Sequence, residues 1–266
     1  MHLSQLTRML LLDQACYTAK NHGKPFMLDI IHCGNHTLLT AANNPLNITQ
    51  NWFVPDYWHH KSAIIAEKKG RSTTWFFNYP QGTGVLRHYW RGGFIGKLLS
   101  DQYFYTGLKN TRTYKEYILL VELEKRGLNV PTAIAAKVET NGFIYRGDLI
   151  TRAIANAQSL LDILKVRPLN NDEIIKVGET IAEFHQQGAF HADLNINNIL
   201  FDDRGRVYLI DFDRGRLLKP FHDCLEGNIK RLNRSFNKEK TRNNRFFWDS
   251  NQWQLLTNAY QKAKTT

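Results

Sequence analysis

The chain has 266 residues, of which 42% are hydrophobic, and its 35 Lys and Arg against 24 Asp and Glu give a formal net charge of +11 at pH 7. This composition excludes a disordered or low-complexity chain, and the length allows one large domain or two lobes. The excess of positive charge indicates an anionic partner (a charged substrate, an anionic membrane surface or nucleic acid), unless it forms a solvated basic surface without function.

The sequence lacks the signals of a membrane-spanning or secreted protein. Its N-terminal apolar run, Met9–Leu12, ends at Asp13 and is too short to cross a bilayer or to form the core of a secretory signal. Three widely spaced cysteines fit neither a zinc pattern nor a disulfide framework: Cys16, Cys33 and Cys224. We therefore expect the protein to remain in the reducing environment of the cytoplasm.

The N-terminal half is predicted to be mostly strands. Residues 1–24 are expected to form a helical extension, whose role the sequence does not indicate. Short apolar runs then alternate with turns, as at Gly34-Asn35, and predict a sheet. A hairpin with strands over Thr73–Tyr79 and Val85–Tyr89 is joined by the turn Pro80–Gly84.

A glycine turn before this hairpin is the candidate phosphate-binding loop. It consists of Gly70, Arg71, Ser72 and Thr73, whose backbone amides and hydroxyls suit phosphate oxygens, although no G-x-G-x-x-G occurs in the chain. The cation that pairs with the phosphates is predicted to be Arg87, on the second hairpin strand, because it stands at the position of the Lys in V-A-I-K. An arginine can do this with a charge that does not titrate. Lys97 is the rival.

A helix over Thr111–Arg126 follows, ended by Gly127. Its Glu116, about one turn in, is expected to pair with the strand cation, with Glu122 and Glu124 as solvated alternatives. Strands from Ile144 to Ile154 then lead to a connection where backbone groups would receive an adenine base.

The most informative segment comes after a helix predicted from an Asn171 cap to Gly188. His191, Asp193 and Asn198 stand as H-x-D-x-x-x-x-N, and Asp211-Phe212 ends an apolar strand further on. Phosphoryl transfer needs one carboxylate to accept the proton of the acceptor hydroxyl, and a carboxylate with an amide to hold Mg²⁺ beside ATP. We therefore predict Asp193 as the base and Asn198 and Asp211 as magnesium ligands.

The neighbours of these residues have less specific patterns. Asn195 stands where protein kinases usually carry a Lys, and is expected to approach the transferred phosphate weakly, unless its amide only satisfies loop backbone. Asp213 replaces the Gly of D-F-G, and with Arg214 and Arg216 it is expected to form a fixed wall beside the phosphates or the acceptor. His191 is expected to brace the loop rather than to do chemistry.

The C-terminal part is strongly basic. A helix over Asn228–Lys240 carries basic side chains that we expect to contact an anionic acceptor or membrane, with a solvated helix face as the alternative: Lys230, Arg231, Arg234 and Lys238. A terminal helix around Trp253–Tyr260 is expected to pack on the protein or to touch lipid.

Taken together, the chain from Asn51 to Tyr260 resembles the Kdo (3-deoxy-D-manno-octulosonic acid) kinases of the lipopolysaccharide-kinase group in the protein-kinase-like superfamily. The segments that carry the resemblance are Lys69–Thr74, Leu86–Gly93, Asp193–Leu200, Asp211–Arg214 and Asn228–Lys240. It implies an α+β, protein-kinase-like bilobal fold. The mostly β N-lobe with one helix would span residues 25–155, and the mostly α C-lobe residues 156–266.

The resemblance also implies a function. It is ATP- and Mg²⁺-dependent phosphorylation of the 4-hydroxyl of Kdo on Kdo-lipid A, by a peripheral protein at the cytoplasmic face of the inner membrane, with no nucleic-acid partner. Two alternatives remain. One is a kinase for heptose, another sugar or a small molecule, and the other is an inactive pseudokinase that binds membrane or nucleic acid through its basic surface.

Overall fold

The computed structural model describes residues 28–42, 44–69, 73–90, 101–220 and 222–265, which form two compact units. The first unit takes the described residues up to Tyr114 together with Ala133–Arg152. The second takes Lys115–Thr132 and the described residues from Ala153 onward. The segment Lys115–Thr132 thus groups with the second unit, although it lies between strands of the first in the sequence. The lobe boundaries at residues 25 and 155 stay a prediction.

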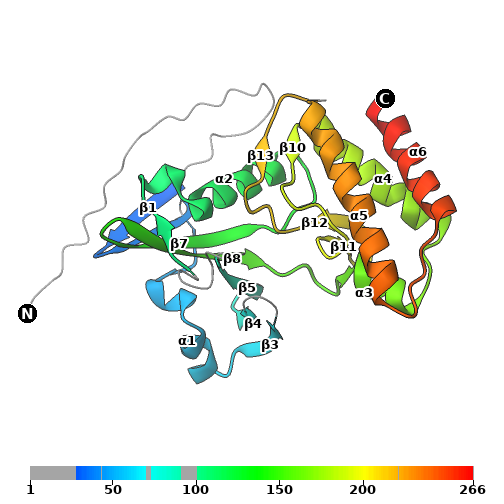
Figure 1. The fold of residues 1–266 in the computed structure, drawn as a ribbon. Coiled ribbons are helices and arrows are strands. Elements are labelled where there is room, and N and C mark those ends of the chain that lie inside the picture. Colours follow the sequence, from blue (N-terminus) through cyan, green and yellow to red (C-terminus); the bar gives the residue numbers. More distant parts are fainter. Residues whose placement is uncertain (1–27, 43, 70–72, 91–100, 221, 266) are drawn as a thin grey trace, which may run out of the picture. The chain divides into compact units, whose positions relative to one another are not determined.

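The described part of the first unit is built on an antiparallel sheet with the strand order β1-β2-β7-β8-β5-β4-β3, and β6 pairs with β8 (Figure 1). Its strands are β1 (Leu28–Cys33), β2 (His36–Ala41), β3 (Ile64–Lys69), β4 (Thr73–Tyr79), β5 (Gly82–His88), β6 (Tyr103–Phe104), β7 (Ala133–Asn141) and β8 (Ile144–Arg152). The predicted hairpin is present as β4 and β5, with Thr74 opposite Arg87.

An aromatic core covers one face of this sheet. It comes from η1 (Gln50–Phe53) and α1 (Pro55–His60), which precede β3. Trp58 stacks on Phe77 with ring centroids 4.1 Å apart, and its Nε1 donates a hydrogen bond to the Trp52 carbonyl at 2.8 Å. Such pairs stabilise a core beyond the area that they bury, because the rings meet in favourable geometry.

The second unit is mostly helical. Its helices are α2 (Arg112–Lys125, in this unit from Lys115), α3 (Leu160–Val166), α4 (Asn171–Gln186), η4 (Asp223–Leu225), α5 (Glu226–Arg242) and α6 (Ser250–Thr265). Its short strands are β9 (Gln158–Ser159), β10 (Ala189–Phe190), β11 (Ile199–Phe201), β12 (Val207–Leu209) and β13 (Arg216–Leu217). The predicted α+β, protein-kinase-like fold class is confirmed, since a sheet unit is joined to a helical one.

Helix α4 is fixed at its start and along its length. Asn170, not Asn171 as predicted, is the N-cap: its side chain accepts from the Glu173 backbone amide, and the Glu173 carboxylate accepts from the Asn170 backbone amide. At Gly178 the helix meets α6 so closely that a Cβ would lie 2.5 Å from the Leu256 carbonyl oxygen. The terminal helix therefore packs on α4, the first of its two predicted placements (Figure 1).

Within the described residues, no helix has both the length and the apolar character needed to cross a membrane.

Candidate active site

The predicted catalytic residues lie on two loops of the second unit. Residues 191–198, the Asp193 loop, connect β10 to β11, and residues 210–215, the Asp211 loop, follow β12. The loops are joined by the Ile210 amide, which donates to the Asn198 carbonyl at 3.0 Å. Pairing of β10 with β13 closes the far side, because Phe190 and Arg216 flank the loops.

His191 lies buried between the two loops and braces both, as predicted. Its Nε2 donates to the Ile210 carbonyl at 2.8 Å, and its Nδ1 accepts from the Asp193 amide at 3.1 Å. Burial lowers the pKa of His191, although nearby Asp211 and Asp193 oppose this effect. The neutral ring fits both bonds, because protonation of Nδ1 would remove the acceptor for the Asp193 amide.

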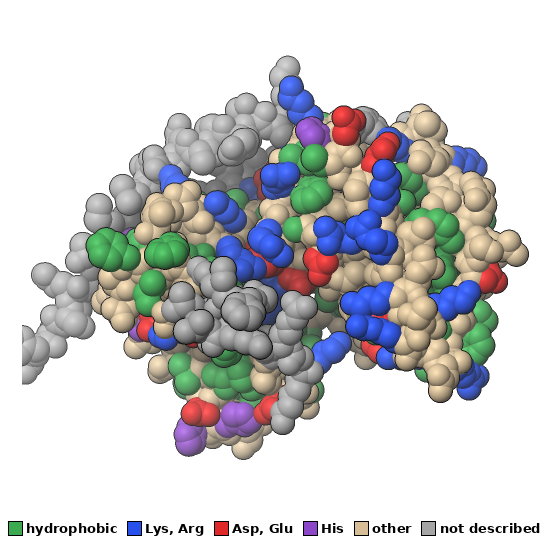
Figure 2. Space-filling model, viewed as in Figure 1, with side chains coloured by type: hydrophobic (Ala, Val, Ile, Leu, Met, Phe, Trp, Pro, Cys, Tyr) green, Lys and Arg blue, Asp and Glu red, His purple; other side chains and the backbone are tan. Residues whose placement is uncertain are grey.

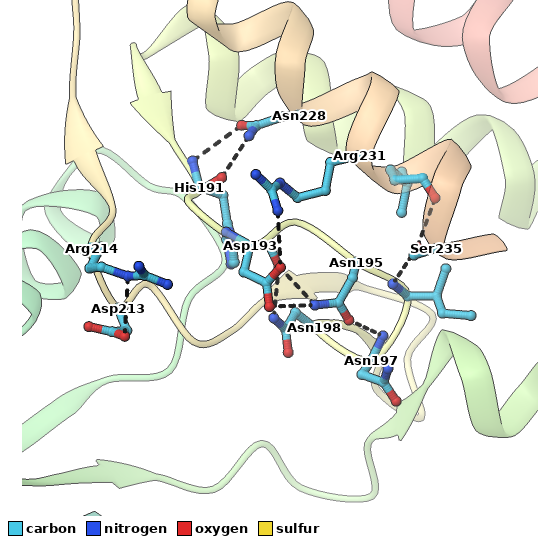
Figure 3. Close-up of polar contacts among 12 residues, drawn as sticks. His191, Asp193, Asn195, Asn197, Asn198, Asp213, Arg214, Asn228, Arg231 and Ser235 are labelled. Carbon is cyan, nitrogen blue, oxygen red and sulfur yellow. Dashed lines mark hydrogen bonds and ion pairs between the residues drawn. The ribbon is translucent and has the colours of Figure 1, made fainter. Parts of the chain in front are cut away.

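Asp193 presents its carboxylate to solvent, with 60% of the side chain exposed. The Asn195 amide nitrogen lies 3.2 Å from Oδ2, and Arg231 Nη1 lies 3.6 Å from Oδ1 (Figure 3). Asn195 also accepts a hydrogen bond from the Asn197 amide at 2.9 Å, so its side chain is held by the loop itself. Its predicted approach to a phosphate stays a prediction.

Asn198, at the end of the Asp193 loop, and Asp211, in the Asp211 loop, supply an amide and a carboxylate. The Asn198 side chain is buried, and its Nδ2 donates to the Asp193 carbonyl at 3.0 Å, which turns its oxygen away from the loop (Figure 3). Asp211 has a φ of 64°, a left-handed conformation that is costly for a residue other than glycine. This strain needs support from the surrounding structure.

The donor set fits a magnesium ion shared with a phosphorylated substrate. Mg²⁺ commonly takes one or two carboxylates and completes its shell with water and phosphate oxygens. Within the described residues, no group of three or more His, Cys, Asp or Glu forms an all-protein metal site. Asn198 and Asp211 therefore suit the predicted role better than they would suit a structural metal, and the role stays a prediction.

The charged residues after Asp211 do not meet as one wall. Arg214 Nε lies 3.9 Å from an Asp213 oxygen, whereas the Arg216 guanidinium lies over the Phe190 ring at 5.2 Å. The turn is tight at Gly215, where a Cβ would lie 2.8 Å from the Phe212 carbonyl oxygen. The turn thus brings Asp213 and Arg214 together and places Arg216 on Phe190, rather than joining all three charges.

Sequence reasoning missed the residues that hold the Asp193 loop from behind. Asn228, buried on α5, donates through Nδ2 to the His191 carbonyl at 2.6 Å and accepts through Oδ1 from the His191 amide at 3.2 Å (Figure 3). About two helical turns further along α5, Ser235 Oγ accepts from the Ile196 backbone amide at 3.3 Å. The sequence held no local signal for either residue, because their partners lie more than thirty residues earlier in the chain.

A second histidine links Asn228 to the terminal helix. Because Asn228 Oδ1 already accepts from a backbone amide, the contact of 3.3 Å from His185 Nε2 makes that nitrogen the donor. His185 Nδ1 then accepts from the Tyr260 hydroxyl at 2.8 Å. Desolvation lowers the pKa of His185 to about 4, so the ring is neutral at pH 7.

The structure describes only some of the residues predicted to bind the nucleotide. Arg87 lies on β5 opposite Leu149, with its guanidinium 5.4 Å from the Tyr89 ring centroid. Thr73 opens β4 opposite Lys69, so the candidate glycine turn connects β3 to β4. Gly70, Arg71, Ser72 and the rival cation Lys97 lie outside the described residues. Glu116 is buried on α2, in the second unit, and its pairing with Arg87 stays a prediction.

The four basic residues predicted to meet an acceptor or membrane all lie on α5 and are exposed: Lys230, Arg231, Arg234 and Lys238. Figure 2 shows Lys and Arg side chains gathered over this helix. Arg231 differs from the other three because it contacts Asp193.

A model of the lipopolysaccharide kinase (Kdo/WaaP) family matches residues 55–260. A 3-deoxy-D-manno-octulosonic acid kinase of Vibrio cholerae is 42% identical over 185 residues, 70% of this chain and 78% of the relative. Proteins of the same name from Vibrio vulnificus and Mannheimia succiniciproducens are 40% and 37% identical, over 80% and 88% of this chain and 89% and 100% of their own lengths.

The chain belongs to this family.

Membership of the Kdo/WaaP family confirms the predicted resemblance and its extent. The match covers the loops with Asp193 and Asp211 and the whole of α5, so the helix that holds the Asp193 loop is part of the family domain. The protein is therefore a kinase, as the order of Asp193, Asn198 and Asp211 predicted.

The free energy of unfolding is predicted to fall as the pH drops from about 6.5 to about 4. The pKa of His185 is lowered to about 4 in the folded protein, so the unfolded chain binds more protons in this window and acid favours it. The contribution is on the order of 3 kcal/mol, with the lowered pKa of His191 acting in the same direction.

Urea unfolding at several pH values measures this effect, and His185→Gln removes the titrating ring between Tyr260 and Asn228. The variant should show a shallower loss of stability on acidification than the unchanged protein. An equal pH dependence in both would assign the acid sensitivity to other groups.

Proposed function

We propose that the protein is an ATP-dependent kinase that phosphorylates the 4-hydroxyl of Kdo on Kdo-lipid A, a step of lipopolysaccharide inner-core synthesis. The observation that carries the proposal is an Asp193 loop joined by hydrogen bonds to the Asp211 loop, in a chain 37–42% identical to proteins named for Kdo phosphorylation. The choice of the 4-hydroxyl and of the lipid A carrier rests on the family resemblance alone.

The chemistry assigned to the site is a direct transfer. The acceptor hydroxyl oxygen attacks the γ-phosphorus of ATP and forms a new O–P bond, while the bond from that phosphorus to the β-phosphate oxygen breaks and its electron pair leaves with ADP. The proton of the hydroxyl passes to the exposed carboxylate of Asp193. Asn198 and Asp211 would hold Mg²⁺, which neutralises charge on the phosphates when bound.

The loop bonds explain how Asp193 is aimed. His191 fixes the Asp193 amide and Asn198 fixes the Asp193 carbonyl, so both ends of this residue's backbone are held while its carboxylate stays exposed. Positioning of a base within hydrogen-bond reach of the reacting proton is the main requirement for this type of catalysis. Arg87, Glu116 and the turn Gly70–Thr73 are assigned to the nucleotide.

We further propose that the protein works at the cytoplasmic face of the inner membrane as a peripheral protein. Lys230, Arg234 and Lys238 are exposed on α5, which also holds the Asp193 loop. An acceptor with a carboxylate and lipid-linked phosphates lies in an anionic surface, and each basic side chain near such a surface contributes roughly 1 kcal/mol of attraction.

Purified protein incubated with labelled ATP, Mg²⁺ and Kdo-lipid A is expected to phosphorylate the Kdo 4-hydroxyl, located by mapping of the product. Asp193→Ala should retain its fold and ATP binding but lose turnover by roughly 10²–10⁴-fold, because it removes the base. Near-normal turnover of this variant would rule out its role. Phosphate transfer to heptose instead of Kdo would replace the acceptor assignment, and no transfer to any sugar would favour a pseudokinase.

Replacement of Arg234 and Lys238 together by Ala should weaken binding to vesicles that contain phosphatidylglycerol by roughly 10- to 30-fold at low salt and raise the KM for Kdo-lipid A. The KM for ATP should barely change. The matched control is Lys165 and Lys176 replaced by Ala, which removes the same charge from exposed positions on α3 and α4. Equal weakening by both pairs would mean that net charge, not this face of α5, draws the protein to membranes.

A further inference from the structure

Asp193 is contacted on both carboxylate oxygens, but only one of the two contacts brings a charge. Asn195, from the same loop, reaches Oδ2 with a neutral amide at 3.2 Å. Arg231, from α5, lies 3.6 Å from Oδ1 with a guanidinium. The loop therefore receives its positive charge from Arg231, which lies 38 residues after Asp193 in the sequence.

The place of Arg231 is fixed by its neighbours on α5. Asn228 and Ser235 stand three residues before it and four residues after it, so the three side chains lie on one side of the helix. Asn228 is hydrogen-bonded to the backbone of His191 at the start of the Asp193 loop, and Ser235 to the Ile196 amide in its middle. Arg231 therefore has to lie between two anchored points, opposite the reacting carboxylate (Figure 3).

The guanidinium has room to bind something besides Asp193. Its side chain is 45% exposed, and among the residues that the structure describes Asp193 is its polar partner, contacted through Nη1. An arginine carries five N–H donors in a planar fork that matches phosphate oxygens. Because nearly half of the side chain is exposed, donors other than the one at Asp193 can bind the oxygens of a phosphoryl group placed beside that carboxylate.

We propose that Arg231 is a catalytic residue, which binds the γ-phosphoryl group during its transfer and supplies the cation that the loop lacks at Asn195. This inference rests on the proposed kinase function. In the transition state the equatorial phosphoryl oxygens carry developed negative charge, which a fixed guanidinium stabilises more than it stabilises bound ATP. In the resting protein the same group pairs with Asp193, so it is already oriented before the substrate arrives.

The proposal separates Arg231 from the basic residues around it. A membrane contact would act on acceptor binding, whereas a phosphoryl contact acts on turnover. Arg231→Ala is therefore expected to lower kcat by roughly 10²–10³-fold and to change the KM for ATP and for Kdo-lipid A by less than about threefold. Arg231→Lys should recover part of the loss, since it keeps a charge but not the fork.

The decisive variant adds a cation to the loop itself. Asn195→Lys in the Arg231→Ala background should restore about tenfold or more of the lost kcat, because the charge then comes from the loop side of Asp193. Arg242→Ala is the matched control, an exposed arginine on the same helix near its end, whose kcat should equal that of the unchanged protein. Thermal unfolding of each variant separates these effects from loss of fold.

A raised KM for Kdo-lipid A with unchanged kcat in Arg231→Ala would make Arg231 an acceptor-binding residue and overturn the proposal. A lowered kcat that neither Arg231→Lys nor Asn195→Lys restores would give it only a structural role. Slow ATP hydrolysis without any acceptor provides a separate readout. If the unchanged protein hydrolyses ATP but does not phosphorylate Kdo-lipid A, the acceptor assignment fails, while a loss of hydrolysis in Arg231→Ala would still support the proposal.

Discussion

The paired hydrogen bonds between Asn228 and the backbone of His191 are the interaction on which the rest of the candidate site depends. One side chain satisfies both the amide and the carbonyl of the residue that opens the Asp193 loop. The His191 ring is then hydrogen-bonded to both loops: Nδ1 accepts from the Asp193 amide, and Nε2 donates to the Ile210 carbonyl. Because His191 and Asn228 are buried, each of the two bonds between them would cost about 1–3 kcal/mol if it were not made.

The same interaction ties the chemistry to the far end of the chain. Tyr260 on α6 donates to His185 on α4, and His185 donates to Asn228 on α5. Close packing at Gly178, where α6 lies against α4, brings Tyr260 within reach. The terminal helix, although distant in the sequence, is therefore connected by hydrogen bonds to the groups directly behind the Asp193 loop.

Helix α5 divides its polar residues between two tasks. Asn228 and Ser235 face the Asp193 loop and hold its backbone, Leu232 and Phe236 fill the core, and the exposed basic residues face solvent. Arg231 stands at the border between these groups, with its charge at Asp193. Arg231 is thus one positive charge of this basic protein that contacts a carboxylate of the candidate site, whereas other basic residues of α5 are proposed to meet an anionic surface.

The sequence predicted the parts of the site that a short motif carries, and little of what supports them. The order of Asp193, Asn198 and Asp211 was sufficient to predict a kinase, because phosphoryl transfer needs a base and metal ligands in such loops, while the role of each residue stays a prediction. The hairpin of β4 and β5 and the helix α4 followed from their turn and cap residues, with the cap misplaced by one position because Asn170 and Asn171 are chemically equivalent candidates.

Asn228, Ser235 and the placement of Arg231 could not be predicted, because each depends on a partner far away in the chain. The residues around a buried asparagine on a helix do not indicate which backbone groups it will bind. In a run of basic residues, the sequence likewise does not distinguish the one that contacts a carboxylate. The wall of Asp213, Arg214 and Arg216 was predicted only from their proximity in the sequence. Arg216 instead lies over the ring of Phe190, after the tight turn at Gly215.

Amide hydrogen exchange in Asn228→Leu tests whether Asn228 holds the Asp193 loop, since leucine keeps the volume but makes neither bond to His191. We expect amides of residues 191–198 to exchange roughly 10- to 100-fold faster than in the unchanged protein, while the amides of α4 away from His185 keep their protection. Unchanged exchange in the Asp193 loop would show that the loop is held without Asn228.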